Sequence, residues 1–139
     1  MKILLLEDDR HILDLLSRMM AEYGECYATD NGIDAVRAFD EAMVNREPFQ
    51  LALLDIMLPG MSGYEVLEKI RHIEAQWKKD GRQGTTVIMV TALNSPKDIL
   101  QAFRDNCEGY LTKPFTSEEL ENILLSLGIT KIHKPNVLS

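Results

Sequence analysis

Chemically reactive side chains stand at the ends of four strand-like runs in this sequence. Asp55 directly follows the apolar run Leu-Ala-Leu-Leu, Glu7 and Asp8 follow the first such run, and Thr91 and Lys113 follow the last two. Short apolar runs are typical of strands buried on both faces, as in a parallel sheet covered by helices. Parallel strands deliver their last residues to one edge, where open α/β sheets bind their ligands. We therefore expect these side chains to share one rim, where they would suit phosphoryl transfer onto a carboxylate.

Asp55 has two interpretations when it is taken alone. It could cap the turn that follows, where Pro59 and Gly60 stand, or it could act as a nucleophile that forms an acyl phosphate. The other rim residues favour the nucleophile. Mg²⁺ prefers one or two carboxylates together with phosphate oxygens and waters, and Asp8 and Asp55 can supply those carboxylates. Lys113 and the metal ion would neutralise the phosphoryl oxygens, and a hydroxyl from the fourth strand would donate a hydrogen bond to one of them.

The elements that must position these residues alternate along the chain. Strands are expected over residues 2–6, 25–30, 51–55, 86–91 and 107–112, and each is followed by a helical pattern. The helices are expected to begin near Asp9, Asn31, Ser62, Ser95 and Thr116. Such alternation predicts a doubly wound α/β fold, in which right-handed crossovers place helices on both faces of a parallel five-stranded sheet, (βα)5.

Apolar spacing predicts which face of each helix turns inward. The expected inner positions are Ile12, Leu15, Leu16 and Met19 in the first helix, Ile33, Val36, Phe39 and Met43 in the second, Val66, Leu67, Ile70 and Ile73 in the third, and Leu120, Ile123, Leu124 and Leu127 in the last. Thr116 followed by Glu119 has the spacing of a capping box. The strand over 25–30 mixes polar and apolar residues, which suits the edge of the sheet.

Composition excludes several classes of protein. The 139 residues suit one domain, and a net charge of −7 disfavours direct nucleic-acid binding, which requires a basic surface. No apolar run is long enough to cross a membrane, and the N-terminus offers no signal peptide, so we expect a cytoplasmic protein. Cys26 and Cys107 are then expected to be buried, reduced thiols. The three histidines, which are expected at the surface, lack the spacing of metal ligands: His11, His72 and His133.

Four motifs in order give the chain a resemblance to the receiver domains of two-component response regulators. They are Leu-Leu-Leu-Glu7-Asp8-Asp9, Leu54-Asp55-Ile-Met-Leu-Pro-Gly60, Val90-Thr91-Ala92 and Tyr110-Leu-Thr-Lys113-Pro114-Phe115. The resemblance implies a flavodoxin-like fold with strand order 2-1-3-4-5. It implies a receiver domain over residues 1–128, with residues 129–139 as a C-terminal tail or linker stub. The third helix is expected to run toward Trp77, and the polar stretch 78–84 is expected to be an exposed loop. The segment 71–85 is longer than is common in the family, and we interpret the extra length as surface without a function rather than as a contact for a partner.

The resemblance also implies a metal site beside the phosphorylated residue. Asp55 matches the phosphorylated aspartate, Asp8 the direct ligand of Mg²⁺ (or Mn²⁺ in its place), and Glu7 the acid that acts through water. The backbone carbonyl of Met57 matches the third protein ligand. Because three acids are adjacent, a shift of one residue would instead select Asp8 and Asp9.

The remaining matches concern the phosphoryl group and the switch. Thr91 and Lys113 match the residues that contact phosphate, and Tyr110 matches the aromatic side chain that changes rotamer with the threonine. The bond preceding Pro114 is expected to be cis. Met57 and Leu93 flank the approach of the hydrolytic water in the family, and neither can orient water strongly, so a long-lived phosphoryl group is expected.

The partners implied are a sensor histidine kinase or phosphotransfer protein that docks near the first helix, and a downstream effector domain or protein. A homodimer that depends on phosphorylation is also implied, whereas nucleic acid and membranes are not. Two other functions remain as alternatives. One is a receiver-like binding module that takes no phosphate. The other is an aspartate-nucleophile phosphatase, which would need an acid where Met57 stands.

Overall fold

The computed structural model describes residues 1–77, 84–92 and 107–132. Its centre is a parallel five-stranded sheet, as the sequence predicted, in the order β2-β1-β3-β4-β5 that the family resemblance implied. The strands are β1 (Lys2–Leu6), β2 (Glu25–Thr29), β3 (Leu51–Asp55), β4 (Thr86–Thr91) and β5 (Gly109–Thr112). β2 is an edge strand, as its mixed sequence indicated, whereas every residue of β3 is buried.

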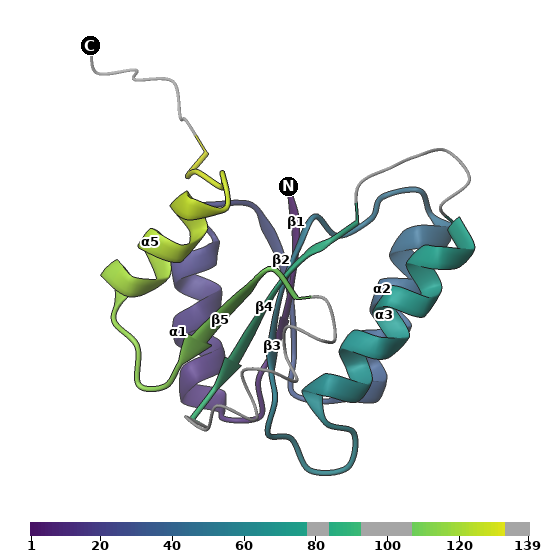
Figure 1. Cartoon of the computed structure of the whole chain (residues 1–139), viewed down its shortest axis with the longest axis horizontal. Helices are drawn as coiled ribbons and strands as arrows, with labels where there is room; N and C mark the ends of the chain where they lie inside the picture. The colour runs from purple at the N-terminus through teal and green to yellow at the C-terminus, as the bar shows by residue number, and fades with distance from the viewer. Residues whose placement is uncertain (78–83, 93–106, 133–139) are drawn as a thin grey trace.

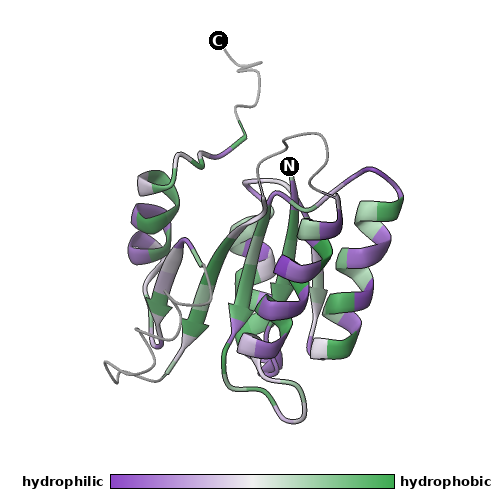
Figure 2. Ribbon diagram, turned by 45° about the vertical axis from the view of Figure 1, so that its right-hand side comes forward, coloured by the Kyte–Doolittle hydropathy of each residue, from purple (hydrophilic) through white to green (hydrophobic). Residues whose placement is uncertain are grey.

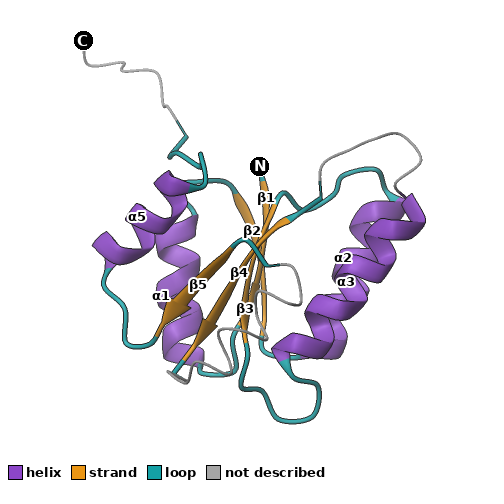
Figure 3. Ribbon diagram, in the orientation of Figure 1, coloured by secondary structure: helices purple, strands orange, loops and turns teal. Residues whose placement is uncertain are grey.

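Four described helices cover the two faces of the sheet (Figure 1). They are α1 (Arg10–Met20), α2 (Gly32–Val44), α3 (Gly63–Trp77) and α5 (Ser117–Ser126). Helices α1 and α5 lie on one face, and α2 and α3 lie side by side on the other (Figures 1 and 3). The helix expected to begin near Ser95 lies outside the described residues.

The sequence explains where several helices begin. Asp9 accepts hydrogen bonds from the backbone amides of His11 and Ile12, which are free at a helix start. Thr116 and Glu119 form the expected capping box of α5.

Two apolar clusters, one on each face, form the core. Beneath α2 and α3, residues such as Leu4, Phe39 and Leu67 are inaccessible to solvent. Beneath α1 and α5, Leu5, Leu16 and other side chains fill the same role. Figure 2 shows the hydrophobic colour concentrated in the strands, while the helices carry both hydrophobic and hydrophilic residues. Burial of this apolar surface is the main favourable contribution to folding.

Two of the predicted inner positions are wrong. Leu15 is 50% exposed, because α1 turns Leu16 and Met20 toward the sheet instead. Ile33, in the first turn of α2, is 67% exposed, and that helix packs through Phe39 and through its alanines. The small alanine side chains let the α2 backbone lie close to the sheet.

Helix α5 ends in a way that extends the packed chain. Gly128 has a φ of 79° and its amide donates to the carbonyl of Leu125, while the amide of Ile129 donates to that of Leu124. Ile129 is 8% exposed and belongs to the core beneath α1 and α5. The amide of Ile132 donates to the carbonyl of Glu22. The first residues past 128 are therefore packed on the domain.

Other expectations concern isolated residues and the membrane. Cys26 and Cys107 are free, half-buried thiols, and burial raises the pKa of both, that of Cys107 to about 11. His11 and His72 are exposed as expected, and His133 lies outside the described residues. Within the part of the chain that the structure describes, no helix has the length and apolar character needed to cross a membrane.

Candidate functional site

Three strand ends bring Glu7, Asp55 and Lys113 into contact at the carboxyl edge of the sheet. The Lys113 ammonium lies 2.6 Å from Glu7 Oε1 and 3.2 Å from Asp55 Oδ2. Asp55 is 2% exposed and Glu7 is inaccessible to solvent. Lys113, directly after β5, thus forms ion pairs with two buried carboxylates: Glu7, directly after β1, and Asp55, the last residue of β3. The three residues are far apart in the sequence.

The acids outnumber the base at this rim. The pKa of Glu7 is raised to about 7, chiefly by burial and also by the neighbouring Asp55 carboxylate, against the opposing effect of Lys113. Glu7 Oε1 forms its ion pair with Lys113 without the alignment of a hydrogen bond. Burial acts to lower the pKa of Lys113, but the Glu7 and Asp55 carboxylates outweigh it, and the pKa is raised. The site therefore favours an additional cation.

Carboxylate oxygens of Glu7, Asp8 and Asp55, which we call the acidic cluster, all lie within 4.8 Å of one another. Asp8 is exposed and Asp55 is buried, so a cation here would be reached from the solvent through Asp8. An all-oxygen donor set suits hard cations such as Mg²⁺. Asp9 is engaged elsewhere, as the N-cap of α1. Of the two pairs that the sequence left open, the structure thus places Glu7 and Asp8 beside Asp55.

Residues that follow β3 contact both the carboxylate and the backbone of Asp55. The amide of Met57 donates to Asp55 Oδ1 at 3.1 Å, and the Met57 side chain is 58% exposed. Gly63, at the start of α3, lies so close that a Cβ there would stand 2.2 Å from the Asp55 carbonyl oxygen. Sequence reasoning missed Gly63, although a glycine in the first helical turn after Ser62 was a signal of close backbone approach.

The other predicted residues lie along β4 and β5. Thr91 is buried at the end of β4, and its carbonyl accepts from the Lys113 amide at 2.7 Å. Tyr110 pairs with Met89 in the sheet and is half-buried against the core beneath α2 and α3. The Lys113–Pro114 bond is cis, as expected.

Comparisons with known proteins agree on one family. Residues 3–125 match the model of the response regulator receiver domain. The chain is 36% identical over 115 residues to the regulatory protein VanRB of Enterococcus faecalis, covering 82% of this chain and 46% of that protein. It is 33% identical over 127 residues to the transcriptional regulatory protein TctD of Salmonella typhimurium, covering 91% and 51%. The chain therefore spans about half the length of these curated relatives.

A solved structure supports the same assignment. The BeF3-activated receiver domain of DrrB, a Thermotoga maritima protein, superposes with a TM-score of 0.69 at 29% sequence identity. The alignment covers 91% of this chain and 93% of that domain.

Proposed function

The chain belongs to the response regulator receiver family, and from that membership we propose that it accepts a phosphoryl group on Asp55 in a reaction that depends on Mg²⁺. The observation that carries the proposal is the contact of Lys113 with Asp55, 3.2 Å apart, beside two further carboxylates. A buried carboxylate with one ammonium and a place for a cation is suited to acyl phosphate formation.

In the proposed reaction, an Asp55 carboxylate oxygen attacks the phosphorus of the donor. A new P–O bond forms to Asp55 while the P–O bond, or the P–N bond of a phosphohistidine, to the leaving group breaks. Lys113 neutralises charge on the transferred oxygens, and Thr91 donates a hydrogen bond to one of them. Asp8, Asp55 and the Met57 carbonyl would hold Mg²⁺, with Glu7 acting through water. When bound, the ion supplies positive charge opposite the phosphoryl oxygens.

We propose that the switch follows from the same contacts. Thr91 would be drawn toward the phosphoryl group, and Tyr110 would turn into the space that it leaves, reshaping the face that β5, α5 and the helix expected near Ser95 form in the family. Of this face, β5 and α5 lie within the described residues. Crystallising the protein with beryllofluoride and Mg²⁺ tests this step, and a Tyr110 side chain that keeps its rotamer would contradict it.

We also propose the partners that the family implies. A cytoplasmic histidine kinase or phosphotransfer protein would be the donor, docking near α1, and an effector domain or protein would receive the output. A homodimer that forms on phosphorylation is part of the same proposal. VanRB and TctD are named as regulatory proteins of about twice this length, which supports an effector but leaves its kind open.

The phosphatase alternative finds no support at Asp55. That class requires an acid two residues after the nucleophile, and Met57 occupies this position. The binding-module alternative would require a site unfit for phosphate, whereas the acceptor, the ammonium and the acidic cluster lie together. Neither alternative explains the arrangement as well.

Intact-mass spectrometry after incubation with acetyl phosphate and Mg²⁺ tests the proposal. We expect the mass of one phosphoryl group to be added to the wild type and to the control Asp40→Asn, an exposed residue of α2, but not to Asp55→Asn. Omission of Mg²⁺ should abolish the addition. Equal labelling of Asp55→Asn and the wild type would refute Asp55 as the acceptor.

A further inference from the structure

A network centred on Arg71 joins α3, the start of β4 and the residue preceding β5. Arg71 donates from Nη1 to Glu74 Oε1 and to the Thr85 carbonyl, each at 2.8 Å. From Nη2 it donates to both carboxylate oxygens of Glu108, at 3.0 and 2.9 Å. Glu108 Oε2 in turn accepts from the Val87 amide at 2.7 Å. We call these five residues the Arg71 network.

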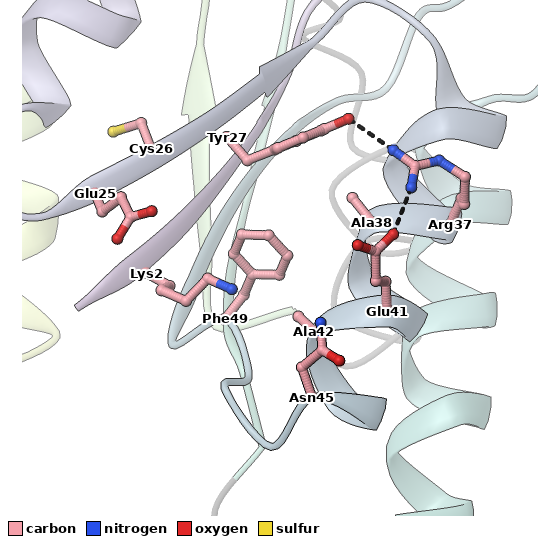
Figure 4. Close-up of a pocket in the computed structure, with 10 residues that line it drawn as sticks. All are labelled: Lys2, Glu25, Cys26, Tyr27, Arg37, Ala38, Glu41, Ala42, Asn45 and Phe49. Carbon is pink, nitrogen blue, oxygen red and sulfur yellow. Dashed lines mark hydrogen bonds and ion pairs between the residues drawn. The ribbon is translucent and has the colours of Figure 1, made fainter.

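The environment of Arg71 makes these contacts strong. The Arg71 side chain is 20% exposed and that of Glu74 is 10% exposed, so water competes little for this pair, whereas the Glu108 side chain is 41% exposed. Charge-assisted bonds from one guanidinium to both oxygens of a carboxylate add geometric restraint to attraction. Lysine could not replace this planar set of donors. By contrast, Arg37 of α2, which pairs with Glu41 (Figure 4), is 54% exposed.

Glu108 stands where β5 is attached to the sheet. Its amide donates to the Val87 carbonyl at 2.9 Å, which extends the pairing of β4 and β5 by one residue. β5 has only four residues, and Lys113 follows it directly. A strand this short moves as a unit, so a displacement at Glu108 would reach Lys113 at its other end. Nothing in the network lies at the rim itself.

We propose that Arg71 is a positioning residue for the phosphoryl site, because its hold on Glu108 fixes β5 and thereby Lys113 beside Asp55. This inference rests on the proposed function of Asp55. Lys113 would contact the phosphoryl oxygens and not the metal ion. Loss of Arg71 should therefore weaken the binding of a phosphoryl analogue and leave the affinity for Mg²⁺ alone unchanged. A residue with a merely structural role would affect both affinities together.

The test is calorimetric titration with Mg²⁺ alone, and then with beryllofluoride in saturating Mg²⁺. We expect Arg71→Met to weaken beryllofluoride binding about tenfold, within the range found for coupling between distant residues, and to keep Mg²⁺ affinity within about twofold. Arg37→Met is the matched control, since it removes ion pairs to Asp34 and Glu41 that do not involve β5. It should leave both affinities unchanged.

Glu108→Gln provides a second variant in case Arg71→Met does not fold. Glutamine keeps an acceptor for the Val87 amide but loses the charge that Arg71 binds. It should also weaken beryllofluoride binding. The double variant should bind beryllofluoride no more weakly than Arg71→Met does, because both changes break the same pair of Arg71 with Glu108. Unchanged beryllofluoride affinity in the two single variants, or a parallel loss of Mg²⁺ affinity, would overturn the inference.

Amide hydrogen exchange of residues 109–113 separates this inference from the proposed function. In metal-free protein, Arg71→Met should exchange faster there than Arg37→Met, because β5 is less firmly held. Equal exchange in the two variants would overturn the positioning role of Arg71, even if the wild type is phosphorylated. A wild type that binds no beryllofluoride would instead refute the proposed function, and with it the role of Arg71 in that function.

Discussion

Removing the ammonium of Lys113 should reveal how much it offsets the charge at the rim. Lys113 lies 2.6 Å from Glu7 and 3.2 Å from Asp55, whose side chains are 1% and 3% exposed. Deleting one partner of a buried ion pair typically costs about 3–5 kcal/mol, because an uncompensated charge remains. For Lys113→Met we expect the lower end of that range, about 3 kcal/mol at pH 8, since Glu7, whose pKa is already raised to about 7, can take up a proton and so remove one of the two buried charges.

The loss of stability should depend on pH in a defined direction. The pKa of Glu7 is already raised by burial to about 7, above the ordinary value of a glutamate, and loss of Lys113 would raise it further. Between the pKa of Glu7 in the unfolded state and its higher pKa in the folded state, the folded protein holds a proton on Glu7 that the unfolded chain releases. The free energy of unfolding therefore falls as the pH rises through this range. The deficit of Lys113→Met should therefore be larger at pH 8 than at pH 5.5.

Urea unfolding at the two pH values, with and without Mg²⁺, measures this deficit. Lys69→Met, at an exposed position of α3, is the control and should stay within about 0.5 kcal/mol of the wild type. Mg²⁺ should stabilise Lys113→Met more than the wild type, because the ion supplies the missing positive charge. A deficit below about 0.5 kcal/mol at pH 8, or one that is equal at both pH values, would refute the electrostatic reasoning.

Three further changes test other parts of the structure. Gly63→Ala should destabilise the protein by about 1–3 kcal/mol and slow labelling by acetyl phosphate, because a Cβ would press on the Asp55 carbonyl; wild-type stability and rate would contradict this. A chain that ends after residue 128 should have a free energy of unfolding, measured in urea, about 1–3 kcal/mol lower than that of a chain that ends after Ile132, because Ile129 is buried. Equal free energies would place the end of the folded domain at residue 128. Cys107, whose thiol pKa is raised by burial to about 11, should react with a thiol reagent at pH 8 far more slowly than after unfolding in urea, and equal rates would argue against that burial.

The sequence predicted the rim well because each part of it has a local signal. Apolar runs that end in Asp55 or in Glu7 identify the strands, and parallel pairing then brings distant strand ends to one edge. The strand order and the cis bond before Pro114 followed from the family resemblance, and both were confirmed. The roles of the individual site residues stay predictions, although the side chains meet where those roles require.

Other features depend on how elements pack, which periodicity does not determine. Helix α1 carries apolar residues at neighbouring positions, so the same pattern fits two rotations of the helix, and the sheet selects the one that exposes Leu15. Ile33 fits a helical stripe, but the alanines of α2 make the close contact instead. The pairing of Arg71 with Glu108 spans 37 residues of sequence and joins α3 to the residue before β5, so no local pattern could indicate it.

The most direct test of the account is to locate the phosphoryl group on the chain. Borohydride reduces an acyl phosphate to an alcohol and releases phosphate, and peptide mass spectrometry then identifies the residue that carried it. After acetyl phosphate and Mg²⁺, we predict reduction at Asp55 alone, and none when Mg²⁺ is withheld. Reduction at Asp8 or Asp9, or a folded, magnesium-loaded protein with no reduced aspartate, would contradict the central claim.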